Sequence, residues 1–165
     1  MKHIFLFLFT LPLFSAAQNC QIKKLKDQFS QEPKVSTGFV KFSSTSVSID
    51  ADAKEIDFFF SLVNNGDSKC FDDGSTITFV YEGGRLKSNF KNTGTMNCEG
   101  LFHVTFRNTA STPSALQRLA TKKVITISLT GNNNTVTTIT LGPEQQQQFM
   151  DMTACLVQEA KTLIK

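Results

Sequence analysis

The chain has 165 residues, of which 40% are hydrophobic and 19% are charged. This apolar content is enough to form a core and the charge is too low to keep the chain unfolded, so the composition excludes a disordered protein and the length predicts a single domain. The formal net charge of +3 comes from basic residues that form no long run, so nucleic acid is not an expected partner.

Residues 1–17 are predicted to be a secretory signal peptide. The segment begins with two polar residues, continues with an apolar run at 4–14 and ends in three small residues. The run is shorter than the roughly twenty residues that span a bilayer, so we expect cleavage rather than anchoring. The predicted mature protein is one domain, residues 18–165, without a transmembrane segment and located in the periplasm or the extracellular space.

An even number of cysteines in an exported chain favours disulfides over free thiols. The cysteines are Cys20, Cys70, Cys98 and Cys155. No two of them are close enough in sequence to form a zinc-finger pair, so no metal site is predicted, and no motif indicates a cofactor. Four cysteines allow three pairings.

Hairpin geometry favours one of these pairings. Residues 76–81 and 86–90 are predicted strands that turn at Gly83 and Gly84. Cys70 and Cys98 lie at nearly equal distances before and after this turn, so both are expected at the open end of one hairpin. We therefore predict a disulfide between Cys70 and Cys98 and, by elimination, one between Cys20 and Cys155.

Most of the remaining chain alternates between apolar and polar residues, which is typical of strands with one buried face. The further predicted strands are residues 47–52, 56–63, 101–107, 125–129 and 136–141. Strand 56–63 differs because Phe59 and Val63 make its second face apolar as well, so we predict a central strand that is covered on both faces. Residues 18–33 are polar and are predicted to form an arm held by Cys20.

Two helices interrupt the strands. A short helix is predicted after Thr112 and Pro113, with Thr112 as its cap, and a longer one after Gly142 and Pro143. The apolar stripe of the longer helix consists of Phe149, Met152, Leu156, Ala160 and Leu163. The predicted fold is a mainly β antiparallel sandwich of about eight strands with these two helices, and an α+β arrangement is the alternative.

Candidate catalytic residues are few. His103 would be the single histidine of the mature chain, and it is out of phase with the apolar residues of its strand, so we interpret it as an exposed or half-covered residue. The closest carboxylate pairs are Asp50 with Asp52, at a strand end, and Asp72 with Asp73, in a predicted turn. We assign no catalytic residue and favour a non-enzymatic role.

A candidate binding loop lies between the strands at 56–63 and 76–81. Its residues of interest are Asp67, Phe71, Asp72 and Asp73. A calcium site is disfavoured in this loop because the carboxylate spacing does not match the twelve-residue calcium loop.

A second candidate surface is rich in hydroxyl groups. Thr126, Ser128 and Thr130 face outward from one predicted strand, next to Thr138 and Thr140 of the following strand. We interpret this surface as the solvent side of a sheet, with binding of a carbohydrate or another regular ligand as the alternative.

Several short motifs occur in a fixed order along the chain. They are KCFDDGS at 69–75, Gly83-Gly84, NCEG at 97–100, Lys122-Lys123 and Cys155-Leu156. With this cysteine signature, residues 20–156 resemble a group of small, uncharacterised, secreted β-rich proteins of bacteria. The resemblance implies a disulfide-stapled domain of the envelope or extracellular space, and it implies no activity.

These observations favour an exported domain that binds a partner or has a structural role at the bacterial envelope. The partner is unknown, and both a protein and a carbohydrate are candidates. Two alternatives are a small hydrolase of envelope polymers that uses Asp or Glu pairs, and a secreted inhibitor or effector that acts through the candidate binding loop.

Overall fold

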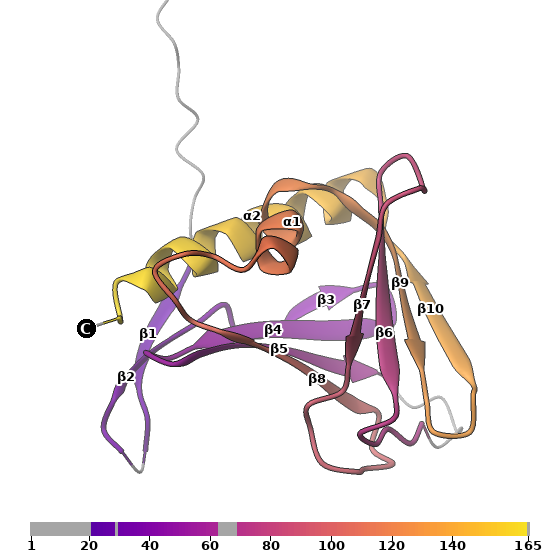
Figure 1. The fold of residues 1–165 in the computed structure, drawn as a ribbon, viewed down its shortest axis with the longest axis horizontal. Coiled ribbons are helices and arrows are strands. Elements are labelled where there is room, and N and C mark those ends of the chain that lie inside the picture. The colour runs from indigo at the N-terminus through magenta and orange to yellow at the C-terminus, as the bar shows by residue number, and fades with distance from the viewer. Residues whose placement is uncertain (1–20, 29, 63–68, 165) are drawn as a thin grey trace, which may run out of the picture.

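A computed structural model describes residues 21–28, 30–62 and 69–164. These residues form ten strands and two helices, with the strands in two antiparallel sheets (Figure 1). The six-stranded sheet contains β1 (Lys23–Lys26), β2 (Pro33–Ser36), β3 (Val40–Phe42), β4 (Thr45–Ala51), β5 (Glu55–Leu62) and β8 (Leu101–Arg107). The four-stranded sheet contains β6 (Thr76–Tyr81), β7 (Lys87–Lys91), β9 (Val124–Thr130) and β10 (Val136–Thr140). The helices are α1 (Ser114–Thr121) and α2 (Pro143–Lys161).

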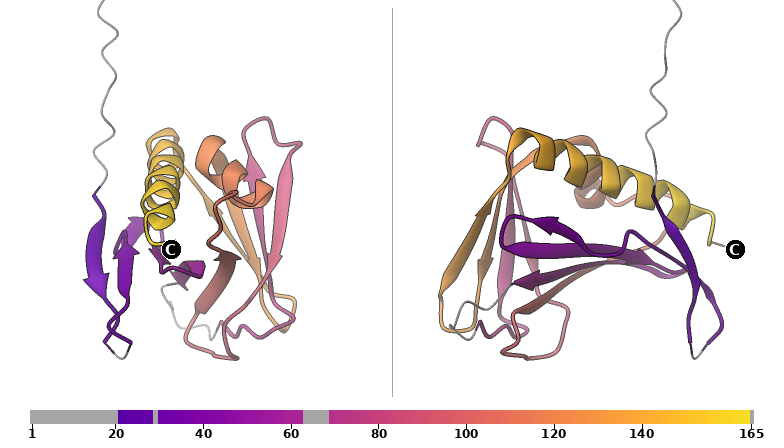
Figure 2. Two further views of the ribbon diagram at one scale, coloured as in Figure 1. Left: turned by 60° about the vertical axis from the view of Figure 1, so that its left-hand side comes forward. Right: turned by 180° about the vertical axis from the view of Figure 1, so that it is seen from behind.

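The core lies in the angle between the two sheets and under α2. The six-stranded sheet has the order β1-β2-β4-β5-β8, with β3 also paired to β4, and the four-stranded sheet has the order β10-β9-β6-β7. Figures 1 and 2 show α2 lying along one face of the six-stranded sheet, while the four-stranded sheet stands at a steep angle to it. We call the face toward α2 the inner face and the opposite one the outer face. The prediction of a mainly β fold with two helices is confirmed.

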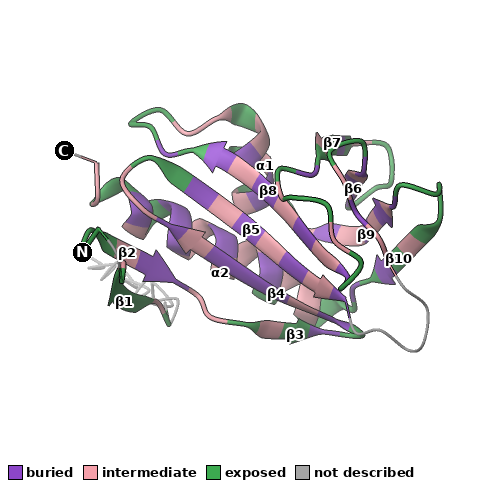
Figure 3. Cartoon of the chain, turned by 90° about the horizontal axis from the view of Figure 1, so that it is seen from below, coloured by how far each residue is buried: buried purple, intermediate pink, exposed green. Residues whose placement is uncertain are grey.

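β5 is central in its sheet, but only its inner face is covered. Ile56, Phe58 and Phe60 are at most 2% exposed and point into the core. Phe59 alternates with them, so it points to the outer face, and it is half-buried. Figure 3 shows no helix or second sheet over this face of β5. The prediction of a strand covered on both faces is therefore wrong at Phe59, and Val63 lies outside the described residues.

The two helices begin close to where the sequence predicts them. α2 starts at Pro143 as expected, whereas Pro113 rather than Thr112 precedes the first residue of α1. The predicted stripe of α2 is correct for its buried residues Phe149, Leu156 and Ala160. Met152 and Leu163 are partly buried and pack against the same core. Thr153 and Val157 are buried as well, and the Thr153 hydroxyl donates to the Phe149 carbonyl at 2.8 Å, which satisfies it in the core. Neither helix in the described part of the chain is long and apolar enough to cross a membrane.

The predicted polar arm, residues 18–33, contains the first strand of a hairpin. All four residues of β1 are exposed, yet β1 pairs with β2 from Lys23 opposite Ser36 to Lys26 opposite Pro33. Backbone hydrogen bonds rather than an apolar pattern define this strand, so hydrophobic alternation could not predict it.

The disulfide between Cys70 and Cys98 is present, as the hairpin geometry predicted. Beside it, Phe71 and Asn97 form an antiparallel bridge, with N···O distances of 2.8 and 3.0 Å. Cys155 is not a free thiol. Its predicted partner Cys20 and the predicted signal peptide lie outside the described residues, so this pairing and the cleavage stay predictions.

Tyr81 gives the core a pH dependence that can be measured directly. Its side chain is 1% exposed, and its hydroxyl donates to Ser88 Oγ at 3.2 Å. Burial raises the pKa of the phenol above its ordinary value of 10.0, although the Ser88 hydrogen bond and the Arg118 charge act in the opposite direction. The folded chain thus favours the neutral phenol, whereas the unfolded chain ionises it near pH 10. We expect the free energy of unfolding to fall as the pH rises from about 10 toward the folded-state pKa.

The chain has one Tyr and no Trp, so phenolate absorbance reports on Tyr81 alone. We expect the native protein to titrate at a higher pH than the same chain in denaturant. Lys34 also has a raised pKa, mainly from its hydrogen bond with Asp27, and it loses stabilisation in the same alkaline range. The Tyr81→Phe variant keeps the Lys34 contribution, so the difference between it and the wild type isolates the effect of Tyr81. If the free energy of unfolding fell equally steeply with pH in both proteins, the prediction would be contradicted.

Candidate functional site

Polar and aromatic side chains form a regular array on the outer face of the six-stranded sheet. Antiparallel register places residues of β4, β5 and β8 in three cross-strand rows. The rows are Ser46–Ser61–Leu101, Ser48–Phe59–His103 and Asp50–Asp57–Thr105. Figure 3 views this face, where less buried positions alternate with buried ones along β5 and β8, whereas Ser48 of β4 is buried. We call these nine residues the outer-face array.

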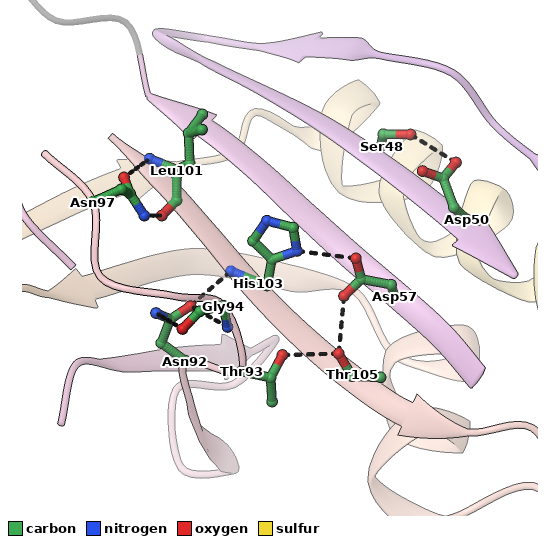
Figure 4. Close-up of polar contacts among 10 residues, drawn as sticks. All are labelled: Ser48, Asp50, Asp57, Asn92, Thr93, Gly94, Asn97, Leu101, His103 and Thr105. Carbon is green, nitrogen blue, oxygen red and sulfur yellow. Dashed lines mark hydrogen bonds and ion pairs between the residues drawn. The ribbon is translucent and has the colours of Figure 1, made fainter. Parts of the chain in front are cut away.

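Asp57 and His103 form a hydrogen-bonded pair within this array (Figure 4). His103 Nδ1 lies 3.0 Å from Asp57 Oδ2, and each side chain is 31% exposed. A carboxylate only accepts hydrogen bonds, so Nδ1 is the donor in this contact. The same reasoning gives the direction of the neighbouring hydrogen bonds. Thr105 donates to Asp57 Oδ1 at 3.1 Å, so its oxygen accepts from the Thr93 hydroxyl at 2.8 Å. Both oxygens of Asp57 are thus held, and the pair fixes the orientation of the imidazole.

The imidazole also packs between the ring of Phe59 and the backbone of Gly94. The Phe59 ring meets it edge to face, with the centroids 4.4 Å apart. On the loop before β8, a Cβ at Gly94 would lie 2.9 Å from His103 Cδ2, so only glycine fits there without displacing the ring. His103 Nε2 has no hydrogen-bond partner among the described residues and points away from Asp57 (Figure 4), where it is able to accept a hydrogen bond from a ligand.

Two asparagine side chains pair with the free edge of β8. Asn92 is 5% exposed, and its Oδ1 accepts the His103 N–H at 2.9 Å. Asn97 accepts the Leu101 N–H at 3.0 Å and donates to the Leu101 carbonyl at 2.9 Å. Together with the Thr93 N–H, which donates to the His103 carbonyl at 3.0 Å, these contacts occupy the backbone groups of Leu101 and His103 on an edge that would otherwise be open there to another strand. The loop at 92–97 therefore positions the array and protects its edge.

A second aromatic ring extends the array. Phe39, between β2 and β3, is 63% exposed, and its ring lies edge to face with Phe59 at a centroid distance of 5.5 Å. Phe39, Phe59 and His103 thus form a continuous series of three rings. An exposed aromatic side chain connected to polar groups in this way is typical of a binding surface.

Asp50 and Asp52, one of the two carboxylate pairs that are close in sequence, have different contacts in the structure. Asp52 accepts the N–H groups of Lys54 and Glu55 at 2.7 and 2.9 Å, which stabilises the turn between β4 and β5. Asp50 instead lies directly opposite Asp57 in the outer-face array, and it accepts a hydrogen bond from Ser48 at 3.0 Å. The structure thus brings together a carboxylate pair that sequence spacing did not indicate.

The candidate binding loop has mainly structural contacts. Phe71 is 2% exposed and packs edge to face on Phe102, so it is a core residue and offers no surface to a partner. Asp72 accepts the N–H of Ser75 at 2.9 Å, as expected for a turn residue. Asp73 is exposed, and Asp67 lies outside the described residues. Partner binding by this loop stays a prediction, without Phe71 as its anchor.

The predicted hydroxyl surface forms the outward side of the four-stranded sheet. Its rows include Thr78–Ser128–Thr138 and Thr76–Thr130–Val136. Ser128 and Thr138 lie within hydrogen-bond distance of each other at 3.3 Å. The surface carries no carboxylate or aromatic ring in these rows, so it lacks the variety of groups found in the outer-face array.

Sequence reasoning identified His103 but missed Asp57, Phe59 and Phe39 as its surroundings. The available signal was the out-of-phase Phe59, an apolar residue on the polar side of its strand, with Asp57 two positions earlier on the same side. Phe39 carried no such signal, because it lies in an irregular segment.

The array is suited to hold a polar ligand in a fixed orientation. It offers carboxylate and imidazole acceptors beside two aromatic rings. No Ser or Thr contacts His103 Nε2 among the described residues, so the pair lacks a bound nucleophile, and the described part of the chain contains no group of three metal-ligating side chains. No protein-family model, curated protein or solved structure matches this chain.

Proposed function

We propose that this chain is an exported bacterial domain that binds a carbohydrate on its outer-face array, without catalysing a reaction. The observation that carries the proposal is the opposed carboxylate pair Asp50 and Asp57, next to His103 and two aromatic rings. Like charges directly opposite each other destabilise a sheet. The chain nevertheless keeps both carboxylates on this face, Asp57 held by His103 and Thr105 and Asp50 held by Ser48, where their oxygens can accept hydrogen bonds from a polar ligand.

Sugar rings present both kinds of surface that the array offers. Their C–H groups pack on aromatic rings, which carry a negative face, and their hydroxyls donate to carboxylates and to a neutral imidazole nitrogen. Phe39 and Phe59 supply the rings, and Asp50, Asp57 and His103 supply the acceptors. The acceptors are held in place by Thr105 and by the loop at 92–97, so little ordering is needed on binding.

The same contacts disfavour the alternatives. Protein interfaces are depleted of Asp relative to the rest of the surface, whereas one of the three rows of this array contains both Asp50 and Asp57. A glycosidase needs two carboxyl groups on either side of the scissile bond. Here Asp50 and Asp57 lie side by side on one sheet face, and both oxygens of Asp57 already accept hydrogen bonds from the protein.

Export is supported by the cysteine chemistry and by the start of the chain. The Cys70–Cys98 disulfide persists in oxidising compartments such as the periplasm or the extracellular space. The predicted signal peptide at 1–17 and the resemblance to secreted bacterial proteins lead to the same location. In that location, polysaccharides of the envelope are the available carbohydrates.

Carbohydrate binding is tested by titrating the isotope-labelled protein with cellohexaose, chitohexaose and mannohexaose and following amide chemical shifts. We expect one of these oligosaccharides to shift the signals of residues 57–61 and 101–105. We expect Phe39→Ala and Asp57→Asn each to weaken binding at least tenfold, because each removes a direct contact worth about 1.4 kcal/mol or more.

Val136→Ala is the matched control. Val136 is 61% exposed, nearly as much as Phe39, but lies on the other sheet. Its replacement should leave the affinity unchanged. Shifts confined to the four-stranded sheet, or equal affinities for Phe39→Ala and the wild type, would contradict the proposal.

A further inference from the structure

A groove rich in basic residues lies far from the outer-face array. It is formed by the turn between β6 and β7, by the junction of α1 with β9 and by one residue of α2, and its volume is about 650 Å³. Small-molecule sites typically have volumes of about 300–1,000 Å³. Figures 1 and 2 show this turn rising beside α1 and α2, on the opposite side of the molecule from the outer face of the six-stranded sheet.

The charges lining this groove are unbalanced. Arg85, Lys122 and Lys123 line it together with one carboxylate, Glu82. None of these four side chains forms an ion pair within the part of the chain that the structure describes. A further cation, Arg118, lies nearby and donates to Ser88 Oγ at 3.4 Å.

The two lysines alone have a structural explanation, because they follow the end of α1 and cations there interact favourably with the helix dipole. Arg85 has no such explanation. It comes from the β6–β7 turn and lines the same groove as the lysines, which brings like charges together. The turn is fixed there because the Glu82 N–H donates to the Lys123 carbonyl at 2.9 Å. A groove with low-dielectric walls and charge of one sign attracts a ligand of the opposite charge.

Beside the charged residues, Gly83 and Thr121, the groove has an apolar part. Leu86 and Met150 form this part, and both are half-buried, while the buried residue Tyr81 also lies along the groove. An inorganic anion would use the cations and leave this surface unfilled. The lining therefore matches a ligand with an anionic group at one end and a hydrocarbon part at the other.

We propose that this groove binds an anionic amphiphile, a molecule with a phosphate, sulfate or carboxylate head and an apolar tail. Arg85 and Lys122 would contact the head, and Leu86 and Met150 would contact the tail. This inference does not depend on carbohydrate binding by the outer-face array. The same head-group chemistry occurs in free amphiphiles and in membrane lipids, and the experiment distinguishes these sources.

The test uses calorimetric titration with dodecyl phosphate below its micelle concentration. Dodecyl maltoside serves as the uncharged probe with the same chain, and inorganic phosphate as the probe without a chain. We expect dodecyl phosphate to bind at least tenfold more tightly than either, with an affinity that falls as salt is added. Equal binding of dodecyl maltoside would overturn the requirement for charge, and equal binding of inorganic phosphate would overturn the role of the apolar lining.

Charge reversal locates the site. Arg85→Glu with Lys122→Glu should weaken dodecyl phosphate binding at least tenfold, and because both side chains are exposed the variant should unfold at the same denaturant concentration as the wild type. The matched control is Lys41→Glu with Lys91→Glu, two exposed lysines that do not line the groove. An equal loss in the control would overturn the assignment to this groove.

Vesicle flotation then separates the two sources of the ligand. Binding to vesicles of phosphatidylglycerol but not of phosphatidylcholine, lost in the groove variant, would assign the site to a membrane head group. Binding of dodecyl phosphate without vesicle binding would assign it to a free amphiphile. Both results support an anionic amphiphile, whereas binding of neither probe overturns the proposal.

Discussion

Replacing Phe149 with alanine is expected to lower the free energy of unfolding by about 4 kcal/mol, the cost of deleting a fully buried phenylalanine. Phe149 is 0% exposed, and its ring contacts an aromatic ring from each of three strands. Its centroid lies 5.8 Å from that of Phe42 in β3, 6.4 Å from that of Phe58 in β5 and 6.2 Å from that of Phe79 in β6. Phe149 therefore connects α2 with both sheets, and its removal leaves a cavity where the three layers meet.

Urea denaturation followed by circular dichroism measures this loss. Phe149→Leu should cost less because it leaves a smaller cavity. Phe39→Ala is the matched control, since it deletes the same side chain at a position that is 63% exposed, and it should cost about 1 kcal/mol or less. Similar losses for Phe149→Ala and Phe39→Ala would contradict this description of the core.

Strands with one buried face were predictable from sequence. In β8, Phe102, Val104 and Phe106 alternate with polar residues, and the structure buries those three residues. The alternation is set by the geometry of a single strand, so it requires no knowledge of the partner strand. The same local reasoning predicted the Cys70–Cys98 disulfide, because the position of the turn is enough to place both cysteines at the open end of one hairpin.

The candidate site was not predictable in the same way. Asp57 and His103 are 46 residues apart in sequence and meet only because β5 pairs with β8 in one register. A shift of one residue would turn every side chain of the strand to the other face. Gly94 and Asn92 reach His103 through an irregular loop, where no periodic pattern exists. Local patterns therefore predicted which residues are buried, and the pairing of distant strands determined which exposed residues meet.

The second large effect is expected from removing the Cys70–Cys98 disulfide. Replacing both cysteines with serine should lower the free energy of unfolding by about 3.5 kcal/mol, the loop-closure value for a separation of 28 residues. This corresponds to a fall of about 10 °C in Tm for a domain of this size. Cys98 is exposed and Cys70 half-buried, so serine adds no fully buried hydroxyl, and the loss should reflect loop closure.

The disulfide should also affect the outer-face array, because it closes the loop that contains both asparagines at the edge of β8. Asn97 is adjacent to Cys98 and accepts the Leu101 N–H, and Asn92 accepts the His103 N–H. Hydrogen exchange in the double serine variant should therefore accelerate more at the backbone amides of Leu101 and His103 than at the backbone amide of Phe58, whose strand lies between β4 and β8. Uniform acceleration across β5 and β8 would contradict this, because it would show that the disulfide stabilises the domain as a whole without holding the loop against His103.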